Sequence, residues 1–241
     1  MRKTEYTLSG PGISMALITD MHERNIGRIL RILDERPSDI ILITGDMTDS
    51  MFSNRLRERT LRNFRAIAQK GKTYFTIGNH EKDLGERELS LILDTGTCVL
   101  DNRYVRLRDG VWLGGLSSLT YRNPDSHPRT HFSDFLDRFC ELRGYRILMC
   151  HHPEYYEWYL KGRDVDLILS GHAHGGQWRF SGRGVYAPGQ GMWPKYTKGV
   201  YDGRLIVSAG CSNSAPVPRL FNPTEVVFVT AGEQNTLADT Q

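Results

Sequence analysis

The chain has 241 residues, of which 39% are hydrophobic and 24% are charged. This length supplies one sizeable core and leaves little room for a second, so we expect a single domain over residues 1–241, with 232–241 as a frayed tail. The net charge is only +3. Such a small excess neither requires nor excludes a polyanionic partner, and the sequence carries no strong nucleic-acid signal.

The cysteines and the apolar segments indicate in which cellular compartment the protein is expected. No cysteines form a CxxC pair, and Cys98 and Cys150 lie in apolar runs, so we expect reduced thiols. No apolar stretch approaches the roughly 18 residues of a spanning helix, and residues 1–6 lack the apolar core of a signal peptide. We expect a cytoplasmic protein without a transmembrane segment, for which peripheral membrane association stays open. The oligomeric state cannot be predicted.

Short apolar runs bounded by Gly, Asp or Asn recur along the chain and predict strands that are buried on both faces. These runs are residues 15–19, 40–44, 74–77, 111–113, 146–150, 165–169, 205–209 and 226–229. Between the early runs, residues 25–35 and 54–70 carry helical apolar stripes that stop before Pro37 and Gly71. This alternation is typical of βαβ units.

The second half has a different pattern. Asp-Gly turns at 109–110 and 202–203 predict hairpins, and helical patterns are confined to 132–142 and 154–160, so a mixed sheet is expected there. The glycine-rich span 175–203 predicts irregular loops beside a site rather than a domain boundary.

Five segments that each follow an apolar run carry residues suited to metal binding. They are Asp20-Met21-His22, Gly45-Asp46-Met47-Thr48-Asp49, Gly78-Asn79-His80-Glu81, Cys150-His151-His152-Pro153 and Gly171-His172-Ala173-His174. In an open α/β sheet such residues gather at the carboxyl ends of the strands. Alternate residues of an extended chain share a face, so Asp20 and His22 are expected to point the same way, as are His172 and His174. Carboxylate, amide and imidazole ligands without thiolates suit manganese, iron or zinc, and we predict a two-metal hydrolytic centre.

These five blocks, in this order, resemble those of the calcineurin-like metallophosphoesterase superfamily over residues 20–174. The resemblance implies an α/β fold in which two facing mixed β-sheets are flanked by helices, a four-layer α/β/β/α sandwich. It also implies two metal sites that share a bridging Asp46. The first site uses Asp20, His22, Asp46 and His174, and the second uses Asn79, His151 and His172. By the same resemblance, His80 lies beside the leaving group as an acid or charge stabiliser, oriented by Asp49.

Two cations about 3.5–4 Å apart lower the pKa of a bridging water and clamp the attacking and leaving oxygens of an in-line displacement. We therefore expect hydrolysis of phosphomonoesters or phosphodiesters by a metal-bridging water or hydroxide. The metal ligands do not decide between these substrates, because the surrounding loops select the rest of the molecule.

Segments beyond His174 are similar to the bacterial YkuE-like subgroup of this superfamily, among them Gly175-Gly176-Gln177, Tyr186-Ala187-Pro188-Gly189 and Pro218-Arg219. Many members of that subgroup have an N-terminal membrane anchor, which is not present in these 241 residues. The expected substrate is a small-molecule or a lipid-linked phosphoester, and the missing anchor weighs against the lipid-linked one.

Several residues near the predicted site have two interpretations. Asp49 also suits a helix N-cap, and Glu81 either supports the site or caps its loop. His152 is expected to be a pocket wall or to support a ligand. The span 175–203 either forms the pocket rim through residues such as Tyr186, Trp193 and Lys195 or covers the sheet edge. Three arginines could bind phosphate or simply be solvated: Arg122, Arg129 and Arg219.

Two rival functions remain. A nuclease acting on DNA ends would need a continuous basic surface and usually another domain, neither of which is evident. A non-catalytic scaffold with the same fold would have no need of His80 together with all seven predicted ligands.

Overall fold

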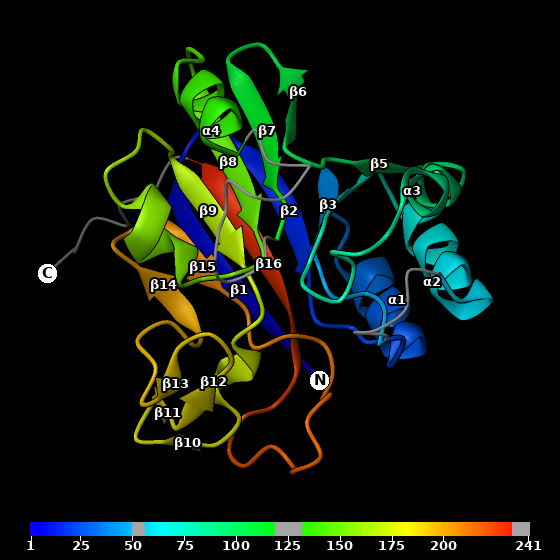
Figure 1. Cartoon of the computed structure of the whole chain (residues 1–241), viewed down its shortest axis with the longest axis vertical. Helices are drawn as coiled ribbons and strands as arrows, with labels where there is room; N and C mark the ends of the chain where they lie inside the picture. The colour runs from blue at the N-terminus through cyan, green and yellow to red at the C-terminus, as the bar shows by residue number, and fades with distance from the viewer. Residues whose placement is uncertain (50–55, 119–131, 233–241) are drawn as a thin grey trace, which may run out of the picture.

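The computed structural model describes residues 1–49, 56–118 and 132–232, and contains two large sheets (Figure 1). The first sheet has six strands in the order β1-β16-β2-β3-β4-β5. Its strands are β1 (Arg2–Ser9), β2 (Ile13–Ile18), β3 (Ile40–Thr44), β4 (Thr73–Thr76), β5 (Thr97–Val99) and β16 (Glu225–Gly232). Strands β2 to β5 are parallel, whereas β16 runs antiparallel to β2 and parallel to β1, so the sheet is mixed.

The second sheet also has six strands, in the order β14-β15-β9-β8-β7-β6. These are β6 (Arg103–Arg108), β7 (Val111–Leu116), β8 (Tyr145–Cys150), β9 (Leu167–Ser170), β14 (Gly199–Tyr201) and β15 (Leu205–Val207). The central strands β15, β9, β8 and β7 are parallel, and an antiparallel strand closes each edge. Those two edge pairs are the hairpins predicted from the Asp-Gly turns, which are therefore confirmed.

Helices cover the outer faces of the two sheets. The helices are α1 (Ile26–Glu35), α2 (Glu58–Ala68), α3 (Glu86–Leu93) and α4 (Phe132–Cys140), followed by a π-helical turn (Tyr156–Leu160). Apolar residues of α1 to α3 pack on the first sheet, and those of α4 and the π-helical turn pack on the second. A third apolar cluster, which includes Leu17, Leu42 and Ile147, joins the inner faces of the two sheets. The predicted α/β/β/α layering is confirmed.

Sequence patterns located the central strands but missed several outer elements. Strands β3, β4, β9 and β15 are buried at every position, as their continuous apolar runs predict. Strand β1 was not predicted, because it is an edge strand whose alternate residues are polar and exposed. Helix α3 and strand β5 are short, and they follow a predicted site motif without a long apolar stripe.

Residues 177–198 and 212–223 lie outside the end of the second sheet and form what we call the outer lobe (Figure 1). It contains two short hairpins, β10 (Arg179–Phe180) with β11 (Arg183–Gly184) and β12 (Tyr186–Ala187) with β13 (Gly191–Met192). A 3₁₀ turn at His174–Gly176 leads into it. Among the described residues, no helix has the length and apolarity required to cross a membrane.

Candidate metal centre

The predicted ligands lie just beyond the carboxyl ends of β2, β3, β4, β8 and β9. Five of the seven have a left-handed backbone: Asp20 (φ 51°), His22 (φ 45°), Asp46 (φ 56°), His172 (φ 62°) and His174 (φ 46°). The prediction that Asp20-x-His22 and His172-x-His174 converge because they are extended is therefore wrong. Tight turns bring these side chains together instead. Such conformations cost of order 1–3 kcal/mol each and cluster at functional sites.

Asp46 is the central residue of this cluster. Its side chain is 1% exposed, and Oδ2 lies 3.9 Å from His22 Nε2, 3.8 Å from His80 Nε2 and 3.2 Å from His151 Nε2. The second oxygen, Oδ1, accepts a hydrogen bond from the backbone N–H of His80 at 3.0 Å. One carboxylate therefore faces imidazoles from both sheets, which is the position that a bridging ligand requires.

Backbone carbonyls set the tautomers of two histidines beside Asp46. His151 donates from Nδ1 to the carbonyl of Thr44 at 2.6 Å, and its Nε2 points to the acceptor oxygens Asp46 Oδ2 at 3.2 Å and Asn79 Oδ1 at 3.1 Å, to which it donates in the metal-free protein. His22 donates from Nδ1 to the carbonyl of Thr48 at 3.2 Å, and its buried Nε2 has no hydrogen-bond partner among the described residues. Orienting the far ring nitrogen in this way is typical of histidines that bind metals.

Asp20 joins the two sheets on the other side of the cluster. Both of its oxygens accept from the backbone N–H of His172 at 3.1 Å, and Oδ1 lies 3.6 Å from His174 Nε2. This approach requires glycine at position 171, because an added Cβ would lie 2.0 Å from Thr19 Oγ1 and 2.5 Å from Asp20 Oδ2. Among the described residues, four overlapping groups have metal-ligand spacing: Asp20/His22/His174, His22/Asp46/His80, Asp46/His151/His172 and His152/Glu154/His172. The first and third of these correspond to the two predicted sites.

The pKa values reflect burial and the anionic charge of Asp46. Burial lowers the pKa of His22 to about 4, and burial together with Arg219 lowers that of His174 to about 3. Burial also holds the pKa of His172 well below its usual value. Burial opposes protonation of His151 too, but the adjacent Asp46 raises its pKa to about 10. The metal-free site therefore combines three imidazoles of low pKa with a protonated His151 that pairs with the strongly ionised Asp46.

Glu81 fixes the two loops that carry Asp46 and Asn79. Its carboxylate is fully buried and accepts hydrogen bonds from the backbone N–H groups of Asp46 (2.9 Å), Thr48 (2.9 Å) and Gly78 (3.0 Å). Burial and the nearby Asp46 charge raise the pKa of Glu81 to about 7. Of its two sequence interpretations, the structure therefore supports the one in which Glu81 braces the site.

Glu154 has a comparable position behind the histidines of the second sheet, and sequence analysis did not single it out. Its side chain is 5% exposed, and Oε1 lies 3.1 Å from His152 Nδ1 and 3.9 Å from His172 Nε2. His152 is buried, stacks on Tyr155 with ring centroids 4.7 Å apart, and is absent from the cavity wall. Of the two expectations for His152, support of a ligand therefore fits better than a pocket wall.

Asp49 and His80 border the same cavity, but their side chains do not pair among the described residues. Asp49 lies 3.4 Å from Arg24 Nη2 and 3.8 Å from His22 Nδ1. His80 directs Nε2 toward Asp46, and its buried Nδ1 has no hydrogen-bond partner in the described part of the chain. The N-cap interpretation of Asp49 does not fit either, because α2 begins at Glu58 with Arg57 as its cap residue.

A cavity of about 1070 Å³ opens over the cluster, and it reaches Asp46, Asn79, His80, His172 and His174. The rest of its wall consists of Asp49, Arg57, Gln177, Tyr186, Pro188, Gly189, Ser214, Ala215, Pro216 and Val217. Sequence analysis did not select Arg57 or the 214–217 loop, since no motif or periodicity marks them, whereas Gln177 belongs to the Gly175-Gly176-Gln177 segment of the predicted rim.

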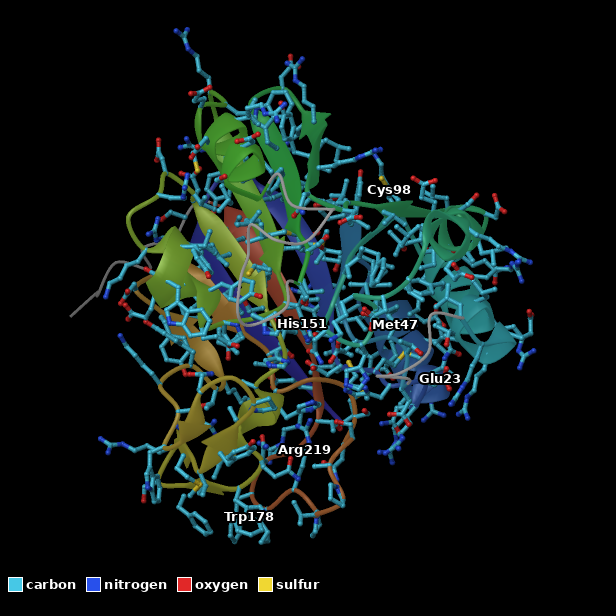
Figure 2. All side chains as sticks on the ribbon, in the orientation of Figure 1. Glu23, Met47, Cys98, His151, Trp178 and Arg219 are labelled. Carbon is cyan, nitrogen blue, oxygen red and sulfur yellow. The ribbon has the colours of Figure 1, made fainter. Side chains whose placement is uncertain are left out.

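The predicted rim is only partly correct. Tyr186 lines the cavity, whereas Trp193 and Lys195 line a separate depression with Arg183 and Thr197. Arg219 is not a cavity residue: it donates to His174 Nδ1 at 3.0 Å and to the carbonyls of Ala209 and Ser212. In Figure 2 it lies between His151 and Trp178. Arg122, Arg129 and tail residues 233–241 lie outside the described residues.

Comparison with known proteins identifies the family. The profile of the calcineurin-like phosphoesterases matches residues 13–176, which is more than half of the chain and includes every residue of the cluster. The chain belongs to the calcineurin-like phosphoesterase family. It is 28% identical to an uncharacterised metallophosphoesterase of Aquifex aeolicus, over 95% of this chain and 88% of that protein.

Other similarities are more partial. The chain is 29% identical to a Danio rerio transmembrane protein with a metallophosphoesterase domain, over 69% of this chain and only 41% of that protein. It therefore spans less than half of that relative. A crystal structure of TT1561 from Thermus thermophilus aligns with 67% of this chain and 82% of its own, with 11% identity and a TM-score of 0.47.

The donor set of this calcineurin-like phosphoesterase fits divalent transition metals. Two buried carboxylates, one amide oxygen and four imidazoles converge without a thiolate, and the buried His22 Nε2 directs a lone pair into the cluster. Burying this many polar groups would be costly unless something paired with them. The residues therefore match the metal ions that the family implies.

Proposed function

We propose that the protein hydrolyses phosphoesters with two divalent transition metal ions, manganese, iron or zinc. Asp20, His22, Asp46 and His174 would hold the first, and Asp46, Asn79, His151 and His172 the second. The observation that carries this proposal is the position of Asp46 Oδ2, within 4 Å of histidine Nε2 atoms from both sheets. When bound, the metals would activate water and neutralise charge on the phosphoryl oxygens.

His80 and Asp49 are the side chains that we expect to act on the leaving group. The backbone N–H of His80 holds Asp46 Oδ1, and this contact places the His80 ring at the cavity, with its side chain 11% exposed. From there His80 can donate a proton or hydrogen bond to the leaving oxygen, a contribution of typically 10²–10⁴-fold in rate. Asp49 would act on His80 only after a side-chain rearrangement, because it faces Arg24 in this structure.

The cavity suits a phosphoester with an organic group beyond the phosphate. Arg57 is the one arginine on its described wall and offers a cation to the phosphoryl oxygens. Tyr186, Pro188 and Val217 give the outer part of the wall an apolar character that can hold the organic group. A small-molecule ester and a lipid-linked ester both fit this description.

Metal stripping followed by reconstitution tests the function. The chelated protein is expected to be inactive toward bis-p-nitrophenyl phosphate and p-nitrophenyl phosphate, and addition of Mn²⁺ should restore hydrolysis of at least one of them. The ratio of the two rates separates a diesterase from a monoesterase. If neither ester were hydrolysed with Mn²⁺, Fe²⁺ or Zn²⁺, although the metals bound, the protein would instead be a non-catalytic scaffold.

A further inference from the structure

Charge is divided unevenly along this chain. Residues 167–224 contain six cations, Arg179, Arg183, Lys195, Lys198, Arg204 and Arg219, and a single acid, Asp202. Their formal charge is therefore +5, while the whole chain carries +3, so the remaining residues carry −2. This segment includes the outer lobe, which is consequently the electropositive end of the molecule.

The outer lobe also exposes large apolar side chains at its tip. Trp178 is 37% exposed, Phe180 51%, Leu220 41% and Phe221 76%. These four form one patch, since Trp178 and Leu220 make a backbone bridge and the rings of Phe180 and Phe221 lie 5.9 Å apart. Figure 2 shows Trp178 at the outer edge of the lobe. Contiguous exposed apolar residues of this kind mark binding surfaces in soluble proteins.

The backbone is strained where it presents the most exposed aromatic rings. Phe221 has φ 52°, and Trp193, which is 68% exposed, has φ 56°. Bulky residues rarely adopt this conformation. The neighbouring Asn222 anchors the tip by donating to the carbonyls of His174 (2.7 Å) and Gln177 (3.2 Å). The aromatic tip is thus tied firmly to the metal-binding turn.

A small cationic cleft lies beside Phe221. It has a volume of about 320 Å³ and is lined by Arg2, Tyr6, Arg179, Lys198, Gly199, Phe221, Asn222 and Pro223. Lys198 forms an ion pair with the buried Glu225. Arg179 donates to the carbonyls of Gly175 and Gly182, and Arg2 forms no ion pair with any residue that the structure describes. The cleft therefore has the size and charge to accept a phosphate headgroup.

We propose that the outer lobe docks on an anionic lipid bilayer, with Trp178, Phe180, Leu220 and Phe221 in the interface and a lipid phosphate in the Arg2/Arg179/Lys198 cleft. Aromatic and aliphatic side chains beside cations are the combination that binds such surfaces. Val217 is 42% exposed and also lines the cavity, so docking would bring the cavity mouth to the lipid headgroups. Docking itself does not depend on the proposed hydrolysis.

Two other occupants fit the lobe less well. Single-stranded nucleic acid requires a continuous groove of cations that follows the backbone, but the cations in and beside the lobe are divided between two separate depressions, Arg183 and Lys195 in one and Arg2, Arg179 and Lys198 in the other. A second copy of the chain would bring two electropositive lobes face to face, and that arrangement is repulsive.

Sedimentation with vesicles tests the proposal without any enzymatic readout. The protein is expected to sediment with phosphatidylcholine vesicles that contain about 30–40% phosphatidylglycerol, to bind pure phosphatidylcholine at least about tenfold more weakly, and to be released by salt. Brominated acyl chains should quench its tryptophan fluorescence. Sedimentation that is independent of anionic lipid, or binding without quenching, would overturn the proposal.

Variants locate the contact. Phe180→Ser with Phe221→Ser should weaken vesicle binding by at least about tenfold, because burial of apolar surface is lost. Arg2→Gln should weaken it severalfold. The matched control is Leu93→Ser on α3, a 51% exposed apolar residue away from the lobe (Figure 1), which should have no effect. Unchanged thermal unfolding confirms that each variant is folded.

Two results would contradict the assignment. Equal losses in the double variant and in Leu93→Ser would show that the lobe is not the contact. Vesicle binding that a short single-stranded oligonucleotide abolishes, with tighter affinity for the oligonucleotide than for the vesicles, would assign the lobe to nucleic acid. Inorganic phosphate alone should compete only weakly, because it lacks the apolar contacts.

Discussion

The two sheets contribute chemically different halves to the site. Strands β2, β3 and β4 of the first sheet lead into Asp20, His22, Asp46 and Asn79, which include every oxygen ligand that we propose. Strands β8 and β9 of the second sheet lead into His151, His172 and His174, which are all imidazoles. Each half also has a buried glutamate, Glu81 for the first and Glu154 for the second.

This difference shows that neither half forms the site alone. The anionic groups of the first half are held by backbone N–H groups: those of His80 and Asp46 bind Asp46 and Glu81 within the same half, and that of His172 in the second half binds Asp20. The second half supplies imidazoles whose charge state depends on burial and on the anions that face them: His172 and His174 stay neutral, whereas Asp46 keeps His151 protonated in the metal-free protein. Metal ions bound between the halves would pair with the carboxylates of the first and the imidazoles of the second, and would thereby link the two sheets.

Removal of the shared carboxylate should have the largest effect. Asp46→Asn keeps the shape of the side chain but removes the charge that faces both groups of histidines, so hydrolysis of bis-p-nitrophenyl phosphate should fall by about 10³-fold or more. Elemental analysis should show loss of at least one metal. Asp94→Asn, an exposed aspartate at the end of α3, is the matched control and should behave as the wild type.

His80→Ala should slow hydrolysis without changing how the two sheets bind the metals. We expect both metals to remain and the rate to fall by about 10²-fold or more for alkyl phosphoesters, with a smaller loss for nitrophenyl esters, whose leaving groups need no proton. Rates measured over a series of leaving groups give the slope. An equal loss across the series would assign His80 to binding or folding instead.

The two buried glutamates should fail in different ways. Glu154→Gln removes the charge 3.9 Å from His172 Nε2, so metal affinity should weaken by about 10–100-fold while the fold persists. Glu81→Gln disturbs three backbone contacts, so the main loss should be in the free energy of unfolding. Titration calorimetry and urea unfolding of both variants separate the effects; the same pattern in both would refute distinct roles.

Acid should destabilise the metal-free protein, with the smallest effect of the series. The folded pKa values of His22 and His174, about 4 and 3, lie below the unfolded value of 6.5, so their stabilising contribution is lost as pH falls below 6.5. The raised pKa of His151 also stabilises the fold, but this contribution to the free energy of unfolding is nearly constant below pH 6.5. Glu81 has a folded pKa of about 7, above its ordinary value of 4.5, so its protonation adds stability as the pH falls from 7 to 4.5 and partly offsets the loss from the histidines.

The net loss should be about 1 kcal/mol or more per pH unit between pH 6.5 and 4.5. Urea unfolding in the presence of a chelator measures this slope. A free energy of unfolding that stays constant or rises over the same interval would mean that these histidines are solvated in the metal-free protein.

Much of the fold and the cluster could be predicted from the sequence, because both rest on local signals. Fully buried strands such as β3 and β9 appear as continuous apolar runs, and the ligands directly follow them. The side chains of Asp20 and His22 meet because the backbone turns in a left-handed conformation, and not because the chain is extended as expected. Such turns leave no periodic signal in the sequence, so this geometry could not be predicted.

Features that depend on tertiary contacts could not be predicted. Glu154 lies behind His172 only because β8 and β9 are paired, and Asp49 faces Arg24 through a contact that no motif encodes. The exposure of Phe221 and the separation of Trp193 from the main cavity depend on the conformation of the outer lobe, which no local pattern encodes.

The metal content of the wild-type chain tests the central claim most directly. We predict two metal ions per chain at saturating Mn²⁺, bound in two resolvable steps in a titration of the metal-free protein, with Asp46→Asn reduced to one or none. A wild-type protein that binds at most one metal per chain at saturation, or an Asp46→Asn protein that still binds two, would contradict a centre shared between the sheets.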